Sequence, residues 1–187
     1  KVKDFINHCV SGGSSVGTKV SRVTESKKNE IGVFSFENAN VFVGRTGYTG
    51  EDGFEIIGLN QTLQKVWDKI LAEGKASGLK PAGLGARDTL RTEVCYPLYG
   101  HELDENTTPI EAGLGFFVDL EKGDFTGRAV LAEQKAAGVK QRLTAFKMIG
   151  ATPPPRSHHG VWKGGPQLGE PCSGGLCPAP GSGTGPP

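Results

Sequence analysis

Hydrophobic positions gather in two neighbouring stretches near the start of the chain, and a short polar segment separates them. Residues 31–36 (IGVFSF) and 40–46 (NVFVGRT) are rich in β-branched and aromatic side chains, and the residues ENA lie between them. Because such runs are typical of strands, the pattern predicts a β-hairpin. After a glycine-rich turn, residues 54–57 (FEII) predict a further short strand.

Residues 60–78 show the helical period instead. Their apolar side chains recur three and four positions apart and predict one buried helix face, formed by Leu63, Val66, Trp67, Ile70 and Leu71. We expect Asn60 to cap the first turn, and Gly74 and Gly78 to end the helix.

The rest of the chain mixes helical and extended patterns. These predict a helix at 83–95, a short helix or turn at 108–115, a strand at 116–122, a helix at 125–138 and a strand at 142–149. Asp124 is expected to cap the fourth of these elements, with Val130 and Leu131 facing inward and Gly138 ending it. Strands interleaved with helices favour an α+β architecture with more than one domain.

Both ends of the chain are weakly patterned. Residues 1–30 are rich in Ser, Gly and Lys, and we assign no elements to them. Nine of the twelve prolines follow residue 151, and residues 170–187 carry few apolar side chains. Because such a tail cannot offset its ordering entropy by burial, we expect poor order there.

Composition excludes two classes of partner. The chain has 21 basic and 20 acidic side chains, which removes the long-range field of a dedicated nucleic-acid-binding protein. No apolar run approaches the roughly 20 residues that a membrane span needs. Since the chain begins at Lys1 without an initiator Met, we expect it to be part of a longer protein.

The cysteines do not predict a metal site. The chain has four, which are too scattered for a disulfide framework: Cys9, Cys95, Cys172 and Cys177. The last two lie near His158 and His159, but no second tight pair of zinc ligands follows them. We favour reduced thiols in an intracellular protein over zinc binding.

Residues 44–56 (GRTGYTGEDGFEI) are the first candidate for chemistry. Their glycines permit a tight backbone path close to a ligand, and Tyr48 offers a ring face and a hydroxyl. Alternation points Glu55 away from Phe54 and Ile56. An inward carboxylate beside a tyrosine suits a planar ligand with two adjacent N–H donors. A solvated hairpin loop with ordinary surface acids is the alternative that the residues leave open.

Residues 83–91 (GLGARDTLR) are the second candidate. Glycines open the predicted helix, so its first backbone N–H groups could meet an anion. Arg87 and Arg91 lie four residues apart on one face, where Asp88 and Glu93 could pair with them. An exposed charged helix face is the alternative. No dinucleotide fingerprint, phosphate-binding loop or nucleophile elbow is present.

Three motifs then occur in the order and spacing of a known family. Residues 45–56, 83–120 and 124–131 (DFTGRAVL) resemble the T-protein of the glycine cleavage system, the aminomethyltransferase family, and the similarity is very specific over 41–150. Residues 153–178 resemble the C-terminal domain of that family more loosely.

The resemblance implies a fold and an activity. Members have folate-binding domains arranged as a three-domain cloverleaf with a C-terminal β-barrel. They move the aminomethyl carbon from the lipoylated H-protein to tetrahydrofolate and release ammonia. For this chain we therefore expect a poorly matched segment at 1–30, a folate-binding core at 31–140 and the start of the barrel domain at 141–187.

The resemblance also implies site residues. By position, Glu55 corresponds to the glutamate that binds the pterin, Arg87 to a folate-contacting arginine and Tyr48 to the tyrosine of the same loop. The family's key aspartate has no counterpart in residues 1–40, since neither Asp4 nor Glu25 has a matching context. We therefore assign no catalytic residue, and we expect no aminomethyl transfer by this chain alone.

Two other functions remain open at the level of sequence. One is the folate-binding C-terminal region of a dimethylglycine or sarcosine dehydrogenase, and the other is a non-catalytic folate-binding module. The resemblance implies the cytoplasm of a bacterium or, alternatively, the mitochondrial matrix.

Overall fold

The computed structural model describes residues 5–15, 18–146, 161–162, 167–169 and 171–173. The chain divides into two compact units, residues 1–87 and residues 88–187. The tail expected to be poorly ordered lies outside the described residues, apart from 171–173.

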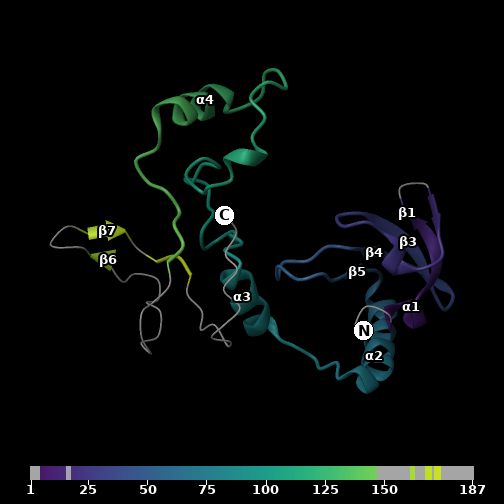
Figure 1. Cartoon of the computed structure of the whole chain (residues 1–187). Helices are drawn as coiled ribbons and strands as arrows, with labels where there is room; N and C mark the ends of the chain where they lie inside the picture. The colour runs from purple at the N-terminus through teal and green to yellow at the C-terminus, as the bar shows by residue number, and fades with distance from the viewer. Residues whose placement is uncertain (1–4, 16–17, 147–160, 163–166, 170, 174–187) are drawn as a thin grey trace. The chain divides into compact units, whose positions relative to one another are not determined.

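An antiparallel five-stranded sheet forms the centre of the first unit, with strand order β2-β1-β3-β4-β5 (Figure 1). Its strands are β1 (Ser11–Ser15), β2 (Thr18–Val20), β3 (Ile31–Phe36), β4 (Ala39–Gly44) and β5 (Glu55–Ile57). The predicted hairpin is confirmed, because β3 and β4 pair from Ile31↔Gly44 to Phe36↔Ala39. The predicted third strand is confirmed as β5, which pairs with β4.

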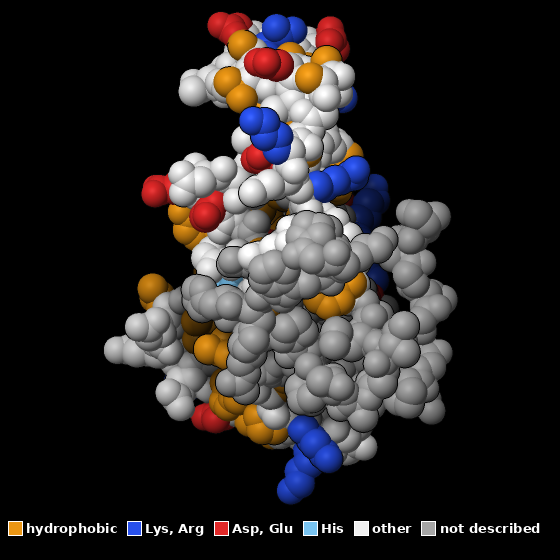
Figure 2. Space-filling view, turned by 90° about the vertical axis from the view of Figure 1, so that its left-hand side faces the viewer, with side chains coloured by type: hydrophobic (Ala, Val, Ile, Leu, Met, Phe, Trp, Pro, Cys, Tyr) orange, Lys and Arg blue, Asp and Glu red, His pale blue; other side chains and the backbone are white. Residues whose placement is uncertain are grey.

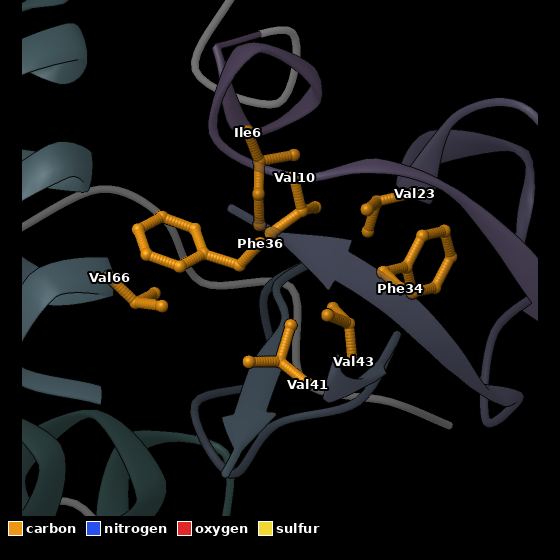
Figure 3. Close-up of a cluster of buried hydrophobic side chains, with 8 residues drawn as sticks. All are labelled: Ile6, Val10, Val23, Phe34, Phe36, Val41, Val43 and Val66. Atoms are coloured by element: carbon orange, nitrogen blue, oxygen red, sulfur yellow. The ribbon is translucent and has the colours of Figure 1, made fainter. Parts of the chain in front are cut away.

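Helical elements cover one face of this sheet. They are α1 (Ile6–Cys9), the short 3-10 helix η1 (Val23–Glu25) and α2 (Asn60–Gly74), which a second 3-10 helix, η2 (Lys75–Ser77), extends. Their apolar side chains and those of β3 and β4 form one buried cluster, made of Ile6, Val10, Val23, Phe34, Phe36, Val41, Val43 and Val66 (Figure 3). Each of these side chains contributes about 1.5–3 kcal/mol by leaving water.

Helix α2 differs from its prediction in two details. Its N-cap is Leu59 without a side-chain cap hydrogen bond, so Asn60 is the first helical residue and not the cap. Val66 is buried and Ile70 packs beside it, whereas Trp67 is 51% exposed. A single stripe of the helix meets the sheet, and Trp67 lies outside that stripe. Gly78 ends η2 in the left-handed conformation.

Residues 5–15 and 18–30 contain elements that the sequence did not predict. Strand β1 (SGGSS) has no apolar pattern, and it forms because β3 offers an unpaired edge on that side. A Cβ on Gly13 would come 1.9 Å from the carbonyl oxygen of Val33, so only glycine permits this close pairing.

The second unit contains short helices joined by long irregular segments. Its elements are α3 (Leu84–Glu93, whose first turn belongs to the first unit), η3 (Gly115–Phe117), α4 (Arg128–Ala137), β6 (Val161–Trp162) and β7 (Gln167–Gly169). The helices predicted at 83–95 and 125–138 are confirmed, and residues 109–113 form turns as expected. Helices with antiparallel sheet confirm the α+β class.

Two strand predictions for this unit are wrong. Residues 116–122 form no strand, and Phe116 and Phe117, both within η3, are 77% and 75% exposed. Residues 142–146 form no strand either, whereas 147–149 lie outside the described residues. A strand needs a neighbouring strand for its backbone hydrogen bonds. The Leu143 amide donates to the carbonyl oxygen of Glu111 at 2.8 Å, but Glu111 lies in a turn and not in a strand.

Helix α4 begins differently from its prediction. Its N-cap is Gly127, with φ 90°, so Asp124 does not cap the helix. Val130 is 54% exposed, because the helix buries little of its surface. Gly138 ends it as predicted. Side chains of both charge signs gather around α4, at the top of Figure 2.

Candidate functional site

The candidate loop connects β4 to β5. Gly44 and Glu55 are ladder partners, so both ends of the loop are held by the sheet. Gly50 adopts φ 76°, a left-handed conformation that a side chain would strain. The sequence predicted this turn from its glycines, and the prediction is confirmed.

Arg45 is the best-connected side chain of the loop. Its Nε and Nη2 donate to the two carboxylate oxygens of Asp52 at 3.0 and 2.9 Å. Its Nη1 donates to the carbonyl oxygens of Thr24 and Ser26 at 3.2 and 2.8 Å. The guanidinium therefore makes four hydrogen bonds, and the pair of bonds to Asp52 is of the strong bidentate kind. Sequence reasoning did not single out this pair.

The structure brings Tyr48 and Arg87 together. The guanidinium carbon of Arg87 lies 4.7 Å from the centroid of the Tyr48 ring. This is a cation–π contact, to which guanidinium groups are well suited because they are planar. It joins the two motifs that the sequence marked separately, the loop at 44–56 and the helix that begins at Leu84.

Glu55 is the first residue of β5, and its side chain is exposed. Ile56 packs partly against the core and Phe54 does the same, so Glu55 points to the opposite face as alternation predicted. That face is the open side of the sheet. An inward-pointing carboxylate was expected, but within the described part of the chain the Glu55 side chain is exposed.

The open face of the sheet carries apolar side chains beside Glu55. Val33, Phe42 and Ile57 are cross-strand neighbours in one row, and each is between 36% and 57% exposed. In the next row Gly44 separates Ile31 from Glu55, and its missing side chain leaves the backbone accessible between them. A carboxylate at the rim of a flat apolar surface suits a planar ligand with polar edges.

Arg91 takes a different role from the one expected. It is 1% exposed and donates to Asp88 at 2.8 Å, to Glu102 at 2.7 Å and to the Ser173 hydroxyl at 2.8 Å. The predicted pairing with Asp88 is confirmed, and the alternative of an exposed charged face is wrong for this residue. Glu93, although exposed, is not its partner among the described contacts. Sequence reasoning missed Glu102, because its pairing depends on a turn eleven residues away.

Glu102 is an ionised acceptor at the centre of this cluster. Burial raises the pKa of Glu102, but hydrogen bonds from Ser173, from the Leu98 amide and from Arg91 outweigh burial and hold the pKa below its ordinary value. A buried pair needs such additional hydrogen bonds to be stable. The cluster therefore fixes α3, which carries Arg87 one turn before Arg91.

Metal and membrane features can be judged only where the structure describes the chain. Within those ranges no three His, Cys, Asp or Glu side chains gather into a group that could hold a metal ion. No helix there has the length and hydropathy to cross a membrane. Cys177, His158 and His159 lie outside the described residues, while Cys9 and Cys95 are free thiols.

Residues 22–122 match the model of the GCVT N-terminal domain. The chain belongs to the GCVT N-terminal domain family. This span contains both candidate motifs and the whole loop between β4 and β5. The predicted resemblance to the T-protein is confirmed.

Curated relatives of this GCVT chain are bacterial proteins named aminomethyltransferase. The protein from Alkaliphilus oremlandii is 47% identical over 153 residues, which cover 79% of this chain and 42% of that protein. A protein from Bacillus cereus is 45% identical over 172 residues, covering 88% of this chain and 46% of the relative. The chain thus spans less than half the length of these relatives.

A solved structure supports the same fold. The glycine cleavage system aminomethyltransferase T from Bartonella henselae matches with a TM-score of 0.53 and 34% identity. The match covers 62% of this chain and 31% of that structure. Fold and sequence therefore lead to the same family.

Proposed function

We propose that this chain provides the folate-binding part of an aminomethyltransferase of the glycine cleavage system. The complete reaction moves the aminomethyl carbon from the lipoylated H-protein to tetrahydrofolate and releases ammonia. Support comes from the family match and from relatives named for this activity. The substrate and the protein partner belong to the proposal, because the chain covers only part of each relative.

The observation that carries the proposal is the contact between Tyr48 and Arg87. Two motifs about forty residues apart in the sequence meet there, and each supplies a group that can contact an aromatic ligand with anionic ends. The guanidinium carbon of Arg87 lies over the Tyr48 ring, 4.7 Å from its centroid. Such a pre-arranged pair reduces the ordering cost of binding.

Glu55 would bind the pterin ring. A pterin presents two adjacent N–H donors, from its 2-amino group and N3, and a carboxylate accepts both at once. The described part of the chain contains no hydrogen bond or ion pair of the Glu55 carboxylate, so its oxygens face solvent from the open side of the sheet. The apolar row of Val33, Phe42 and Ile57 beside it fits the flat faces of the ring.

The chemical step is not assigned to a residue of this chain. The described side chains bind and orient the folate, whose amine nitrogen receives the carbon when it is bound. The family's key aspartate has no counterpart in residues 1–40, so no residue of this chain is assigned to a proton transfer at that nitrogen. We therefore limit the role of these residues to binding and orientation.

The architecture proposed for the complete protein follows the family. It comprises a three-domain cloverleaf with a C-terminal β-barrel, of which residues 31–140 are part of the folate-binding core and 141–187 begin the barrel domain. The proposed compartment is the bacterial cytoplasm, because the relatives compared are bacterial. The dehydrogenase alternative is less well supported, since those relatives carry the name aminomethyltransferase.

A chimera tests this function. The matched part of the chain, 79% of its length, would replace the corresponding part of the Alkaliphilus oremlandii aminomethyltransferase. We expect ammonia release from aminomethylated H-protein that depends on added tetrahydrofolate, with a loss in the Glu55→Gln chimera. Glu51→Gln, which removes the same charge four residues earlier, is the matched control. The proposal would be contradicted by a folded chimera whose activity is the same without tetrahydrofolate, or the same after Glu55→Gln.

A further inference from the structure

The loop between β4 and β5 has little packing of its own. An added Cβ at Gly47 would meet no atom within 4 Å, and Gly47, Gly50 and Glu51 are exposed. The Glu51 amide donates to the Thr49 hydroxyl at 3.4 Å, which is at the weak end of hydrogen-bond geometry. Something other than a core must therefore hold Tyr48 against Arg87.

The bridge between Arg45 and Asp52 closes this loop through side chains. The two residues are seven positions apart and enclose Tyr48, and both nitrogens of one edge of the guanidinium meet both carboxylate oxygens. The side chains are only 25% and 29% exposed. A bidentate, partly shielded pair is stronger and more directional than an ordinary surface ion pair.

The same guanidinium also fastens the loop to a buried part of the fold. Its remaining nitrogen bonds the carbonyl oxygens of Thr24 and Ser26, and Ser26 is 1% exposed. The backbone of Arg45 adds hydrogen bonds to Asn29 and Glu30, each at 2.9 Å. Arg45 therefore connects the loop to η1 and to the chain that follows it, and Asp52 closes the side-chain ring with Arg45.

We propose that Arg45 and Asp52 are positioning residues that set the conformation of loop residues 46–51 and so present Tyr48 to Arg87 for folate binding. Only the last step of this proposal, folate binding, rests on the proposed function. Neither residue needs to touch the ligand. Asp52→Asn and Arg45→Lys should loosen the loop without unfolding the sheet, because the ladder from Ile31 to Gly44 stays intact.

Backbone ¹⁵N relaxation of the 187-residue chain measures the conformational part without any ligand. In the unsubstituted chain the amides of 46–51 should have order parameters of about 0.85. In Asp52→Asn these order parameters should fall below about 0.6. The Arg87 Nε–H resonance should also lose its ring-current shift from Tyr48. Glu51→Gln is the matched control and should change neither signal.

Titration with tetrahydrofolate measures the functional part. Asp52→Asn and Arg45→Lys should weaken binding roughly fivefold to tenfold, in proportion to the loss of a pre-formed loop. The charge exchange Arg45→Asp/Asp52→Arg should not restore affinity, because an aspartate at 45 cannot donate to the carbonyl oxygens of Thr24 and Ser26. Full restoration would show a simple ion pair and overturn the positioning role.

The two measurements separate the two claims. Unchanged order parameters in a folded Asp52→Asn chain overturn the inference, whatever the folate result. A second outcome is that Asp52→Asn loosens an ordered loop but the unsubstituted chain does not bind tetrahydrofolate. In that case the proposed function fails, and the role of the Arg45–Asp52 bridge in the loop stands. If the loop of Asp52→Asn is loosened but the variant binds tetrahydrofolate as tightly as the unsubstituted chain, the link between the Arg45–Asp52 bridge and binding is overturned.

Discussion

Arg91 donates through Nη1 to Glu102 Oε2 at 2.7 Å, and the side chains are 1% and 9% exposed. The pair joins α3 to the turn that contains Leu98 and Glu102, and Ser173 adds the segment at 171–173. Three separate parts of the second unit thus meet at one arginine. Arg91 lies one helical turn after Arg87 on α3.

Replacing Glu102 should destabilise the second unit strongly. Glu102→Gln leaves the buried guanidinium of Arg91 without its best partner, and breaking a buried pair in this way costs about 3–5 kcal/mol. Urea denaturation followed by circular dichroism measures the free energy of unfolding. Glu93→Gln, an exposed acid on the same helix, should change it by less than about 0.5 kcal/mol. Equal effects of both substitutions would contradict the role of the cluster.

The contribution of Glu102 should also depend on pH. The pKa of Glu102 in the folded chain is below its unfolded value, so the stabilisation is complete above about pH 4.3 and is lost as the pH falls through the lower folded pKa. The difference in stability between the unsubstituted chain and Glu102→Gln should thus be constant at neutral pH and shrink below pH ~4. Other acids titrate in both proteins and cancel. A difference that grows on acidification would contradict the sign.

Truncating a valine side chain should cost more stability on the buried face of the sheet than on the open face. Val43→Ala removes buried methyl groups from the core and should cost about 2 kcal/mol in the free energy of unfolding. Val33→Ala makes the same change on the open face and should cost under about 0.5 kcal/mol. Thermal denaturation of both variants checks this. A large loss for Val33→Ala would mean that the open face is covered.

Arg87→Lys should weaken binding of tetrahydrofolate several-fold although the positive charge is kept. An ammonium cannot lie flat on the Tyr48 ring or offer a two-pronged donor edge, and a cation–π contact alone is worth about 0.5–1 kcal/mol at an exposed site. Fluorescence titration measures the dissociation constant. If lysine substitutes without loss, Arg87 acts as a point charge only.

Local patterns predicted those elements whose partners are close in sequence. The hairpin of β3 and β4 follows from its runs of β-branched and aromatic residues, and the helix α2 follows from the helical period of its apolar residues. The strands expected at 116–122 and 142–149 depend on pairing that the residues themselves do not specify. The same holds for Trp67, whose exposure depends on how α2 crosses the sheet.

The candidate site divides in the same way. Tyr48, Glu55 and Arg87 could be named from their motifs, and the contact between Tyr48 and Arg87 joins two of them. Asp52 and Glu102 could not, because an acid in a loop looks alike whether it is solvated or paired. Only the fold brings Asp52 to Arg45 and Glu102 to Arg91, and so separates the structural acids from Glu55.

Equilibrium titration of the 187-residue chain with tetrahydrofolate tests the central claim most directly. We predict saturable binding that Glu55→Gln weakens roughly tenfold to a hundredfold, since a donor then opposes the pterin donors and a charge-assisted pair is worth about 1.5–3 kcal/mol. Glu51→Gln should leave the dissociation constant unchanged. Equal affinity of the Glu55→Gln variant and the unsubstituted chain would contradict the account, and residues 44–56 would then be a solvated hairpin loop.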